Sequence, residues 1–238
     1  VFAISTLRTT LMIDIVTAVI GSGILSCLAL PDQEKSTEPQ SFLPDIITGI
    51  RYAFKNRFIG KLLFIYGLFT LLCVPAGYLA GLLVRRTFGN TYWYLTAVEI
   101  VGFAGMTVGG VVMSIWGGFR KRERTLTEGL FAFGAFAIGM GLTKNFILYL
   151  FLMFFYGIAL TAAQTSITTL LQEKSEPAMH GRVFGLFSTM YAGFLPLGML
   201  LFGPLADLVP LQWLMAGSGA ALIAIAGIIG VRLKFRNI

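Results

Sequence analysis

Two carboxylates lie well inside long apolar stretches of this sequence, where they are the residues best suited to carry a proton. Asp14 falls within Leu11–Leu30, and Glu99 falls within Trp93–Trp116. A charge at the middle of a bilayer costs roughly 2.5–3.5 kcal/mol, so such an acid is expected to be protonated, paired or in contact with water. Asp14 and Glu99 are therefore the candidate proton-coupling residues. The alternative is a carboxylic acid that only hydrogen-bonds across a helix contact.

Polar and small side chains recur at helical spacing on three of the apolar stretches. In a membrane helix, such a stripe faces the bundle interior or a water-filled cavity. The stripes comprise Tyr66, Thr70, Cys73, Gly77 and Gly81; Glu99, Gly102, Met106, Gly109 and Met113; and Gly157, Thr161, Gln164, Thr168 and Gln172. The candidate substrate-cavity residues are Tyr66, Thr70, Met106, Thr161, Gln164 and Thr168. The alternative is that the Thr and Gln side chains only bond a neighbouring helix.

Seven apolar stretches must position these residues. Each has at least 18 residues, and at about 1.5 Å per helical residue this length crosses a hydrocarbon layer of about 30 Å. Of all residues 56% are hydrophobic and only 12% charged, whereas a soluble domain has about 25% charged residues. The stretches are Leu11–Leu30, Leu62–Val84, Trp93–Trp116, Thr125–Leu142, Phe146–Leu170, Val183–Leu205 and Trp213–Val231. The sequence therefore predicts an all-α polytopic membrane protein.

The basic residues lie between these stretches and predict an orientation. A cytoplasmic C-terminus places 14 of the 18 Lys and Arg residues in the cytoplasm, and the four others are Arg8, Arg85, Arg86 and Lys144. The positive-inside rule favours this arrangement. A nucleic-acid partner is not expected, because its binding needs basic residues clustered on one face.

A polar segment divides the chain. Pro31–Gln40 is rich in proline and charge and predicts a linker, and apolar residues then recur at helical spacing over Leu43–Phe54, as in a helix on the cytoplasmic membrane surface. The alternative for this segment is a plain spacer. The expected domains are a transmembrane helix (1–30), a cytoplasmic linker (31–59) and a six-helix bundle (60–238). One span before the linker and six after it lead us to expect part of a longer protein.

Prolines and glycines inside the stretches predict breaks and close contacts. Proline removes a backbone donor and clashes with the preceding turn, so interruptions are expected at Pro75, Pro196 and Pro204, either as hinges or, as is commoner, as fixed kinks. The Gly-x-x-x-Gly spacing, which lets membrane helices approach closely, occurs at residues 77–81 and 105–109. With 28 glycines in the chain, this spacing is also expected by chance.

The sequence has no arrangement typical of an enzyme or a metal site. Cys27, Cys73 and His180 lack metal-ligand spacing, and the chain has no phosphate-binding Gly-x-x-x-x-Gly-Lys run. We therefore expect neither enzymatic activity nor a bound cofactor.

Several segments resemble the major facilitator superfamily. Gly117–Arg122 is similar to its Gly-rich, basic cytoplasmic motif, although the acidic residue of that motif is missing. Gln172–Gly185 resembles a loop of the drug and siderophore exporter branch, which includes macrolide-efflux proteins. Leu11–Ala18 is similar to the sixth helix of that branch, and Gly203–Asp207 to the end of its eleventh.

The resemblance covers essentially the whole chain, as helices six to twelve. It implies the last helix of an N-terminal half followed by a complete C-terminal half, in a plasma membrane. It also implies proton-gradient-driven efflux of a hydrophobic or amphipathic small molecule, such as a macrolide, by alternating access, with the N-terminal half of the transporter and the lipid bilayer as partners. The candidate gating and loop residues are Gly117, Arg120, Arg122, Gly181, Arg182 and Asp207. The alternatives are a seven-helix receptor and the membrane subunit of an ATP-driven permease.

Overall fold

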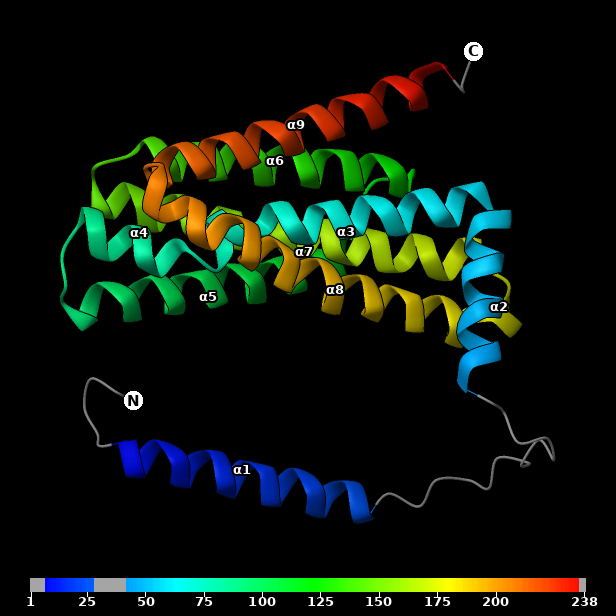
Figure 1. The fold of residues 1–238 in the computed structure, drawn as a ribbon, viewed down its shortest axis with the longest axis horizontal. Helices are drawn as coiled ribbons and strands as arrows, with labels where there is room; N and C mark the ends of the chain where they lie inside the picture. The colour runs from blue at the N-terminus through cyan, green and yellow to red at the C-terminus, as the bar shows by residue number, and fades with distance from the viewer. Residues whose placement is uncertain (1–6, 28–41, 236–238) are drawn as a thin grey trace. The chain divides into compact units, whose positions relative to one another are not determined.

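A computed structural model describes residues 7–27 and 42–235, and the chain forms two units, residues 1–41 and 42–238. In the first unit, α1 (Leu7–Cys27) is a helix of 21 residues (Figure 1). At about 1.5 Å per residue it is long enough to cross a bilayer. It corresponds to the first predicted span. The predicted linker at residues 31–40 lies outside the described residues.

The second unit contains the other predicted spans. Among the described residues, six helical segments are long and apolar enough to cross a membrane. They are α3 (Arg57–Gly77) with α4 (Ala80–Thr87), α5 (Tyr92–Trp116), α6 (Arg122–Leu142), α7 (Phe146–Lys174), α8 (His180–Leu208, preceded by the short η1, Pro177–Met179) and α9 (Leu211–Phe235). The described part of the chain has no strand. The predicted all-α membrane architecture is confirmed.

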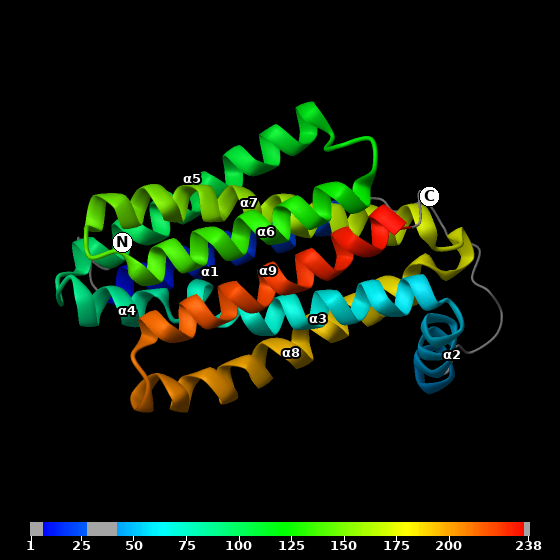
Figure 2. The ribbon, with the colours of Figure 1, turned by 90° about the horizontal axis from the view of Figure 1, so that it is seen from above.

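These helices form an arc in which each packs mainly on its neighbours. Along the arc the order is α5, α7, α6, α9, α3 and α8 (Figure 2). Consecutive spans run in opposite directions, so the helix termini gather at two opposite ends of the bundle. One end, which we call the basic end, carries Arg57, Arg120 and Lys174; the far end carries Arg86 and Lys144. Arg120 and Lys144 lie at opposite ends because α6 runs between them.

The helix α2 (Phe42–Lys55) lies across the basic end of the bundle (Figure 1). It packs on α8 and α3, and small residues make the contact: a Cβ on Gly49 would lie 3.3 Å from Cβ of Arg182, and one on Gly60 would lie 2.6 Å from the Ala53 carbonyl oxygen. Ile50 remains exposed beside Arg51. The predicted amphipathic helix is present, and its membrane contact stays a prediction.

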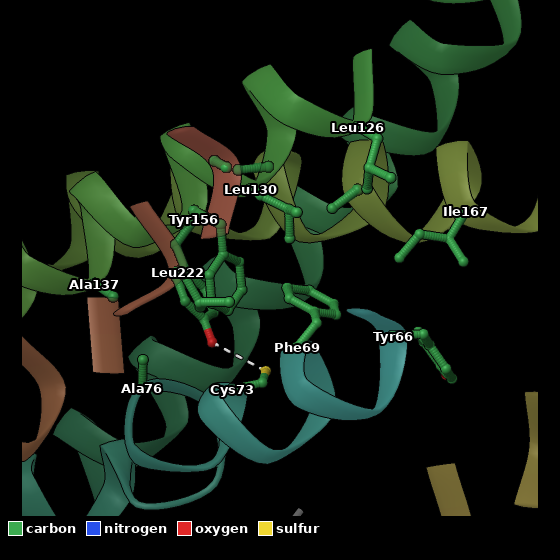
Figure 3. Packing of buried hydrophobic residues seen from close by; sticks show 14 of the residues in the cluster. Tyr66, Phe69, Cys73, Ala76, Leu126, Leu130, Ala137, Tyr156, Ile167 and Leu222 are labelled. Atoms are coloured by element: carbon green, nitrogen blue, oxygen red, sulfur yellow. Dashed lines mark hydrogen bonds between the residues drawn. The ribbon is translucent and has the colours of Figure 1, made fainter. Parts of the chain in front are cut away.

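Aromatic residues fill the core where α3, α6 and α7 meet. Phe133 packs edge-on against Phe69 and lies 4.3 Å from the ring centroid of Tyr156. The Tyr156 hydroxyl is 3.5 Å from Sγ of Cys73, and Figure 3 shows this pair beside Leu222 and Leu130. This core thus packs α3, α6 and α7 against one another in the middle of the bundle.

The contact between α5 and α7 requires glycine. A Cβ on Gly105 would collide with the carbonyl oxygen of Phe154, and one on Gly157 would lie 2.6 Å from the carbonyl oxygen of Gly102. A Cβ on Gly109 would lie 2.9 Å from Cα of Ile158. We call this contact the glycine seam. The Gly-x-x-x-Gly spacing at 105–109 therefore marks a close helix contact.

Three prolines lie inside the helices α3 and α8. The helix α3 passes through Pro75 and ends two residues later, where the amides of Tyr78 and Leu79 both donate to the Val74 carbonyl. The helix α8 continues through Pro196 and Pro204 as one helix, so neither proline ends it, and the kink or hinge expected at each stays a prediction. Each proline removes one backbone donor, and transmembrane helices tolerate that loss.

Candidate functional site

A group of polar aromatic side chains gathers where α3, α7 and α8 meet. The Tyr66 ring stacks on Phe187, with centroids 3.9 Å apart and planes 17° apart. Its hydroxyl lies next to the side chains of Gln164 and Thr70. In Figure 3, Tyr66 lies at the edge of the buried cluster that also contains Phe69 and Leu130. Tyr66 therefore connects the bundle core to the polar side of α7.

A second pair of tyrosines extends this group toward the far end. The Tyr78 hydroxyl is 2.8 Å from that of Tyr191, which joins the end of α3 to α8. Tyr191 follows Phe187, the stacking partner of Tyr66, by about one turn of α8, so the two pairs are neighbours and form one group. We call Tyr66, Tyr78, Gln164, Phe187 and Tyr191 the polar cluster.

The polar cluster opens onto a side of the bundle that other helices leave uncovered. In the most apolar part of each span, only 17% of α8 is buried, compared with 56% of the segment formed by α3 and α4. Exposed polar residues on this side are Gln164, Thr165, Ser188, Thr189 and Tyr191. Lipid would leave such groups without partners. This side is therefore suited to face water or another part of a protein.

The chemistry of the polar cluster is neutral and amphipathic. Tyrosine hydroxyls donate and accept hydrogen bonds, and the Gln164 amide does both. The half-buried Phe187 ring offers an apolar face, which also attracts cations, whereas the Tyr66 ring stacked on it is buried. None of the five residues carries a formal charge. The arrangement fits an amphipathic molecule with hydroxyl, carbonyl or amine groups.

Four residues expected in a cavity take part in hydrogen bonds to helix backbone in the structure. The Thr161 hydroxyl donates to the Met106 carbonyl oxygen at 3.2 Å and to the Gly157 carbonyl oxygen at 3.1 Å. Thr161 and Met106 thus belong to the glycine seam. Thr168 donates to the Gln164 carbonyl oxygen within its own helix. Thr70 likewise donates to its own helix, at the Tyr66 carbonyl oxygen, but it also lies beside the Tyr66 hydroxyl.

The candidate proton-coupling residues lie on two separate units. Asp14 is exposed on α1, and its backbone oxygen accepts from Thr17. Glu99 is exposed on α5, and its carboxylate has no hydrogen bond or ion pair within the described residues. It interacts electrostatically with Tyr149 of α7. The Tyr149 hydroxyl is buried and also lacks a hydrogen-bond partner in the described part of the chain.

The loop between α5 and α6 has a defined backbone shape. Gly117 and Gly118 have φ angles of 68° and 82°, a left-handed conformation that favours glycine. The Phe119 amide donates to the Thr125 hydroxyl at 2.8 Å, and the Arg124 guanidinium lies 4.7 Å from the centre of the Phe119 ring. Arg120 is left exposed at the basic end.

An ion pair connects neighbouring helices at the basic end. Arg122 Nε lies 3.4 Å from Oε1 of Glu173, joining the start of α6 to the end of α7. Arg182, near the start of α8, donates to Sδ of Met179 at 3.4 Å. A Cβ on the neighbouring Gly181 would meet nothing within 4 Å. Gly117, Arg120, Arg122, Gly181 and Arg182 therefore share this end of the bundle.

Asp207 lies at the far end, so it does not belong with the other gating and loop residues. Its Oδ1 is 2.7 Å from Nη2 of Arg86, and Arg86 also donates to the Ala206 carbonyl oxygen. This ion pair fastens α4 to the end of α8.

The family model described as Major Facilitator Superfamily matches residues 1–199 of the chain. Macrolide efflux protein A of Streptococcus pyogenes is 26% identical over 94% of this chain and 56% of its own length. The protein of the same name from Enterococcus faecalis is 25% identical over 83% of this chain and 62% of its own length. A lincomycin resistance protein of Streptomyces lincolnensis is 31% identical over 51% of this chain and 24% of its own length. The chain thus spans little more than half the length of the macrolide relatives.

Proposed function

We propose that this chain, which belongs to the major facilitator superfamily, is part of an exporter of amphipathic small molecules such as macrolides. Family membership makes it a multi-pass membrane transporter in a lipid bilayer, not an enzyme. The receptor and the ATP-driven permease subunit are removed as alternatives by the same match. The names of the macrolide and lincomycin relatives support a drug substrate.

One observation carries this proposal: an uncharged polar cluster on the uncovered side of α3, α7 and α8. A membrane bundle with exposed Gln164 and Tyr191 needs a polar environment on that side. The N-terminal half of the transporter would cover this side and enclose a cavity. A substrate in the cavity would stack on aromatic rings and exchange hydrogen bonds with Gln164 and the tyrosine hydroxyls.

The proposed mechanism is proton-driven alternating access. Glu99, and Asp14 on α1, are the acids proposed to bind the proton. Each end of the bundle has an ion pair: Arg122 with Glu173 at the basic end and Arg86 with Asp207 at the far end. We propose that these ion pairs form and break as the cavity opens to one side of the membrane and then to the other. We place the C-terminus in the cytoplasm and the protein in the plasma membrane, because the basic end carries most of the positive charge.

The test compares Gln164→Ala with Gln172→Ala, which changes the same residue type on the same helix outside the polar cluster. Cells that express the whole transporter are loaded with a radiolabelled macrolide, and its efflux rate is measured at equal protein level. Loss of one substrate hydrogen bond should lower the efflux efficiency of Gln164→Ala about three- to tenfold, and Gln172→Ala should match the wild type. Equal rates for both variants would remove the polar cluster from the site. Absence of efflux by the wild type would refute the function itself.

A further inference from the structure

A groove on the outside of the bundle combines an apolar lining with two opposite charges. It lies between α3, α6 and α9 and has a volume of about 480 Å³. Its apolar residues include Phe58, Phe64, Leu68, Leu126, Ile225 and Ile228. Lys61 and Glu123 are the charged residues of the lining.

The groove is separate from the proposed substrate site. Lys61, Phe64 and Leu68 recur at helical spacing along one side of α3. Tyr66 and Thr70 follow Lys61 by five and nine residues, which at 3.6 residues per turn places them on the opposite side of the helix. Phe64 and Ile228 are exposed, so the groove opens outward from the bundle.

The two charged residues of the groove both lie near the basic end of the bundle. Lys61 is in the second turn of α3 and Glu123 is in the first turn of α6, and both helices begin at the basic end. Neither side chain makes a hydrogen bond or an ion pair with any other described residue. Two unpaired opposite charges at one groove, at headgroup depth, complement a ligand that carries both charges.

We propose that this groove binds a phospholipid with an ethanolamine headgroup. One acyl chain lies along Phe64, Leu68 and Ile228, Lys61 donates to the phosphate, and the Glu123 carboxylate accepts from the ammonium group. Such charge-assisted hydrogen bonds are the strong ones. A choline headgroup has no N–H to donate to Glu123, and a glycerol headgroup donates only from neutral hydroxyls, so it brings no positive charge to the Glu123 carboxylate.

Native mass spectrometry of the detergent-purified transporter tests this proposal. The protein is mixed with phosphatidylethanolamine, phosphatidylcholine or phosphatidylglycerol of identical acyl chains, and retained lipid is counted. The wild type should retain the ethanolamine lipid about tenfold more than the choline lipid, the effect of one charge-assisted hydrogen bond. Glu123→Gln should abolish this preference, and Lys61→Ala should weaken retention of both lipids. The matched controls Glu128→Gln and Lys144→Ala, which lie outside the groove, should behave as wild type.

A second pair of variants tests the acyl-chain contact without changing a charge. Ile228→Trp fills the groove and should reduce lipid retention severalfold. Ile147→Trp, an exposed apolar position outside the groove, should leave it unchanged. Equal retention of the ethanolamine and choline lipids by the wild type, a preference for the glycerol lipid, or equal effects of the two tryptophan variants would each overturn the proposal. Efflux measurements are not needed, so the result is independent of the proposed transport function.

Discussion

The Glu99 carboxylate is the residue of the proposed mechanism that lies inside an apolar span of the bundle. It is exposed on α5, and it interacts electrostatically with the buried Tyr149 hydroxyl. An ionised carboxylate only accepts hydrogen bonds, whereas a protonated one also donates. Proton binding by a carboxylate therefore changes both its charge and the kinds of group with which it can form hydrogen bonds. These are the properties that a coupling residue needs.

We expect Glu99→Gln to abolish proton-coupled efflux while leaving the protein level in the membrane unchanged. The amide resembles a permanently protonated acid in shape and charge, so it cannot release a proton. Efflux is measured with imposed pH gradients, and immunoblotting of membranes gives the protein level. Glu128→Gln, at an exposed acid that pairs with Arg124, is the control. Wild-type transport by Glu99→Gln at several pH values would remove Glu99 from the mechanism.

Helical spacing identified part of the polar cluster but not its partners. Tyr66 and Gln164 were predicted because each lies on a polar stripe. Phe187 and Tyr191 were missed, because spacing shows which residues share one side of a helix but not which helix they meet. The same limit explains Thr161, which lies on the stripe of Gln164 yet bonds across the glycine seam. Only the packing of α5 against α7 separates these two cases.

At the level of helices, the glycine seam determines how α5 and α7 pack. Apolar helices gain little from contact with one another in lipid, so their association depends on close approach. At Gly105, the neighbouring backbone leaves no room for a side chain, whereas a Cβ on Gly110 of the same helix would meet nothing within 4 Å. Substitutions at Gly105 and Gly110 therefore compare a closely packed position with an open one on the same helix.

We expect Gly105→Ala to destabilise the protein by about 1–3 kcal/mol, the usual cost of overpacking. Gly110→Ala should be neutral or slightly stabilising, because alanine favours helix by about 1 kcal/mol over glycine. Thermal unfolding of the detergent-purified protein gives the Tm of each variant. The same Tm for both variants would contradict the packing shown by the structure.

The helices themselves were largely predictable from the sequence, whereas the effect of each proline on its helix was not. Apolar length located the spans, because a bilayer demands about 20 apolar residues per helix. Proline content suggested three interruptions, but α8 continues through Pro196 and Pro204 as one helix. A break depends on whether neighbouring groups satisfy the freed carbonyls. That information is absent from the composition of the helix.

At the level of the whole molecule, consecutive spans run in opposite directions, and the basic residues of the loops therefore lie at two opposite ends of the bundle. The basic end holds the loop with Arg120, and the far end holds Lys144. A membrane must lie between these ends, because the connecting helix α6 is apolar and long enough to cross it. The sides of the membrane on which Arg120 and Lys144 lie therefore determine the orientation of the whole bundle.

We expect Lys144→Cys to react with a membrane-impermeant maleimide in intact cells. Arg120→Cys should react only after the cells are permeabilised, because the positive-inside rule places the basic end in the cytoplasm. Both variants are made in a cysteine-free background, and labelling is read as a mass shift on a gel. Labelling of both positions from the same side would contradict a membrane-spanning α6. The reverse pattern would invert the proposed orientation.

The contrast between the glycine seam and the polar cluster bears on how such a transporter acquires new specificities. Gln164 and Tyr191 are exposed, so most replacements there disturb few neighbours and leave the bundle folded. Replacements at Gly105 or Gly157 force two backbones apart. Under selection by an unfamiliar antibiotic, adaptive substitutions should accumulate at the former positions and be purged at the latter.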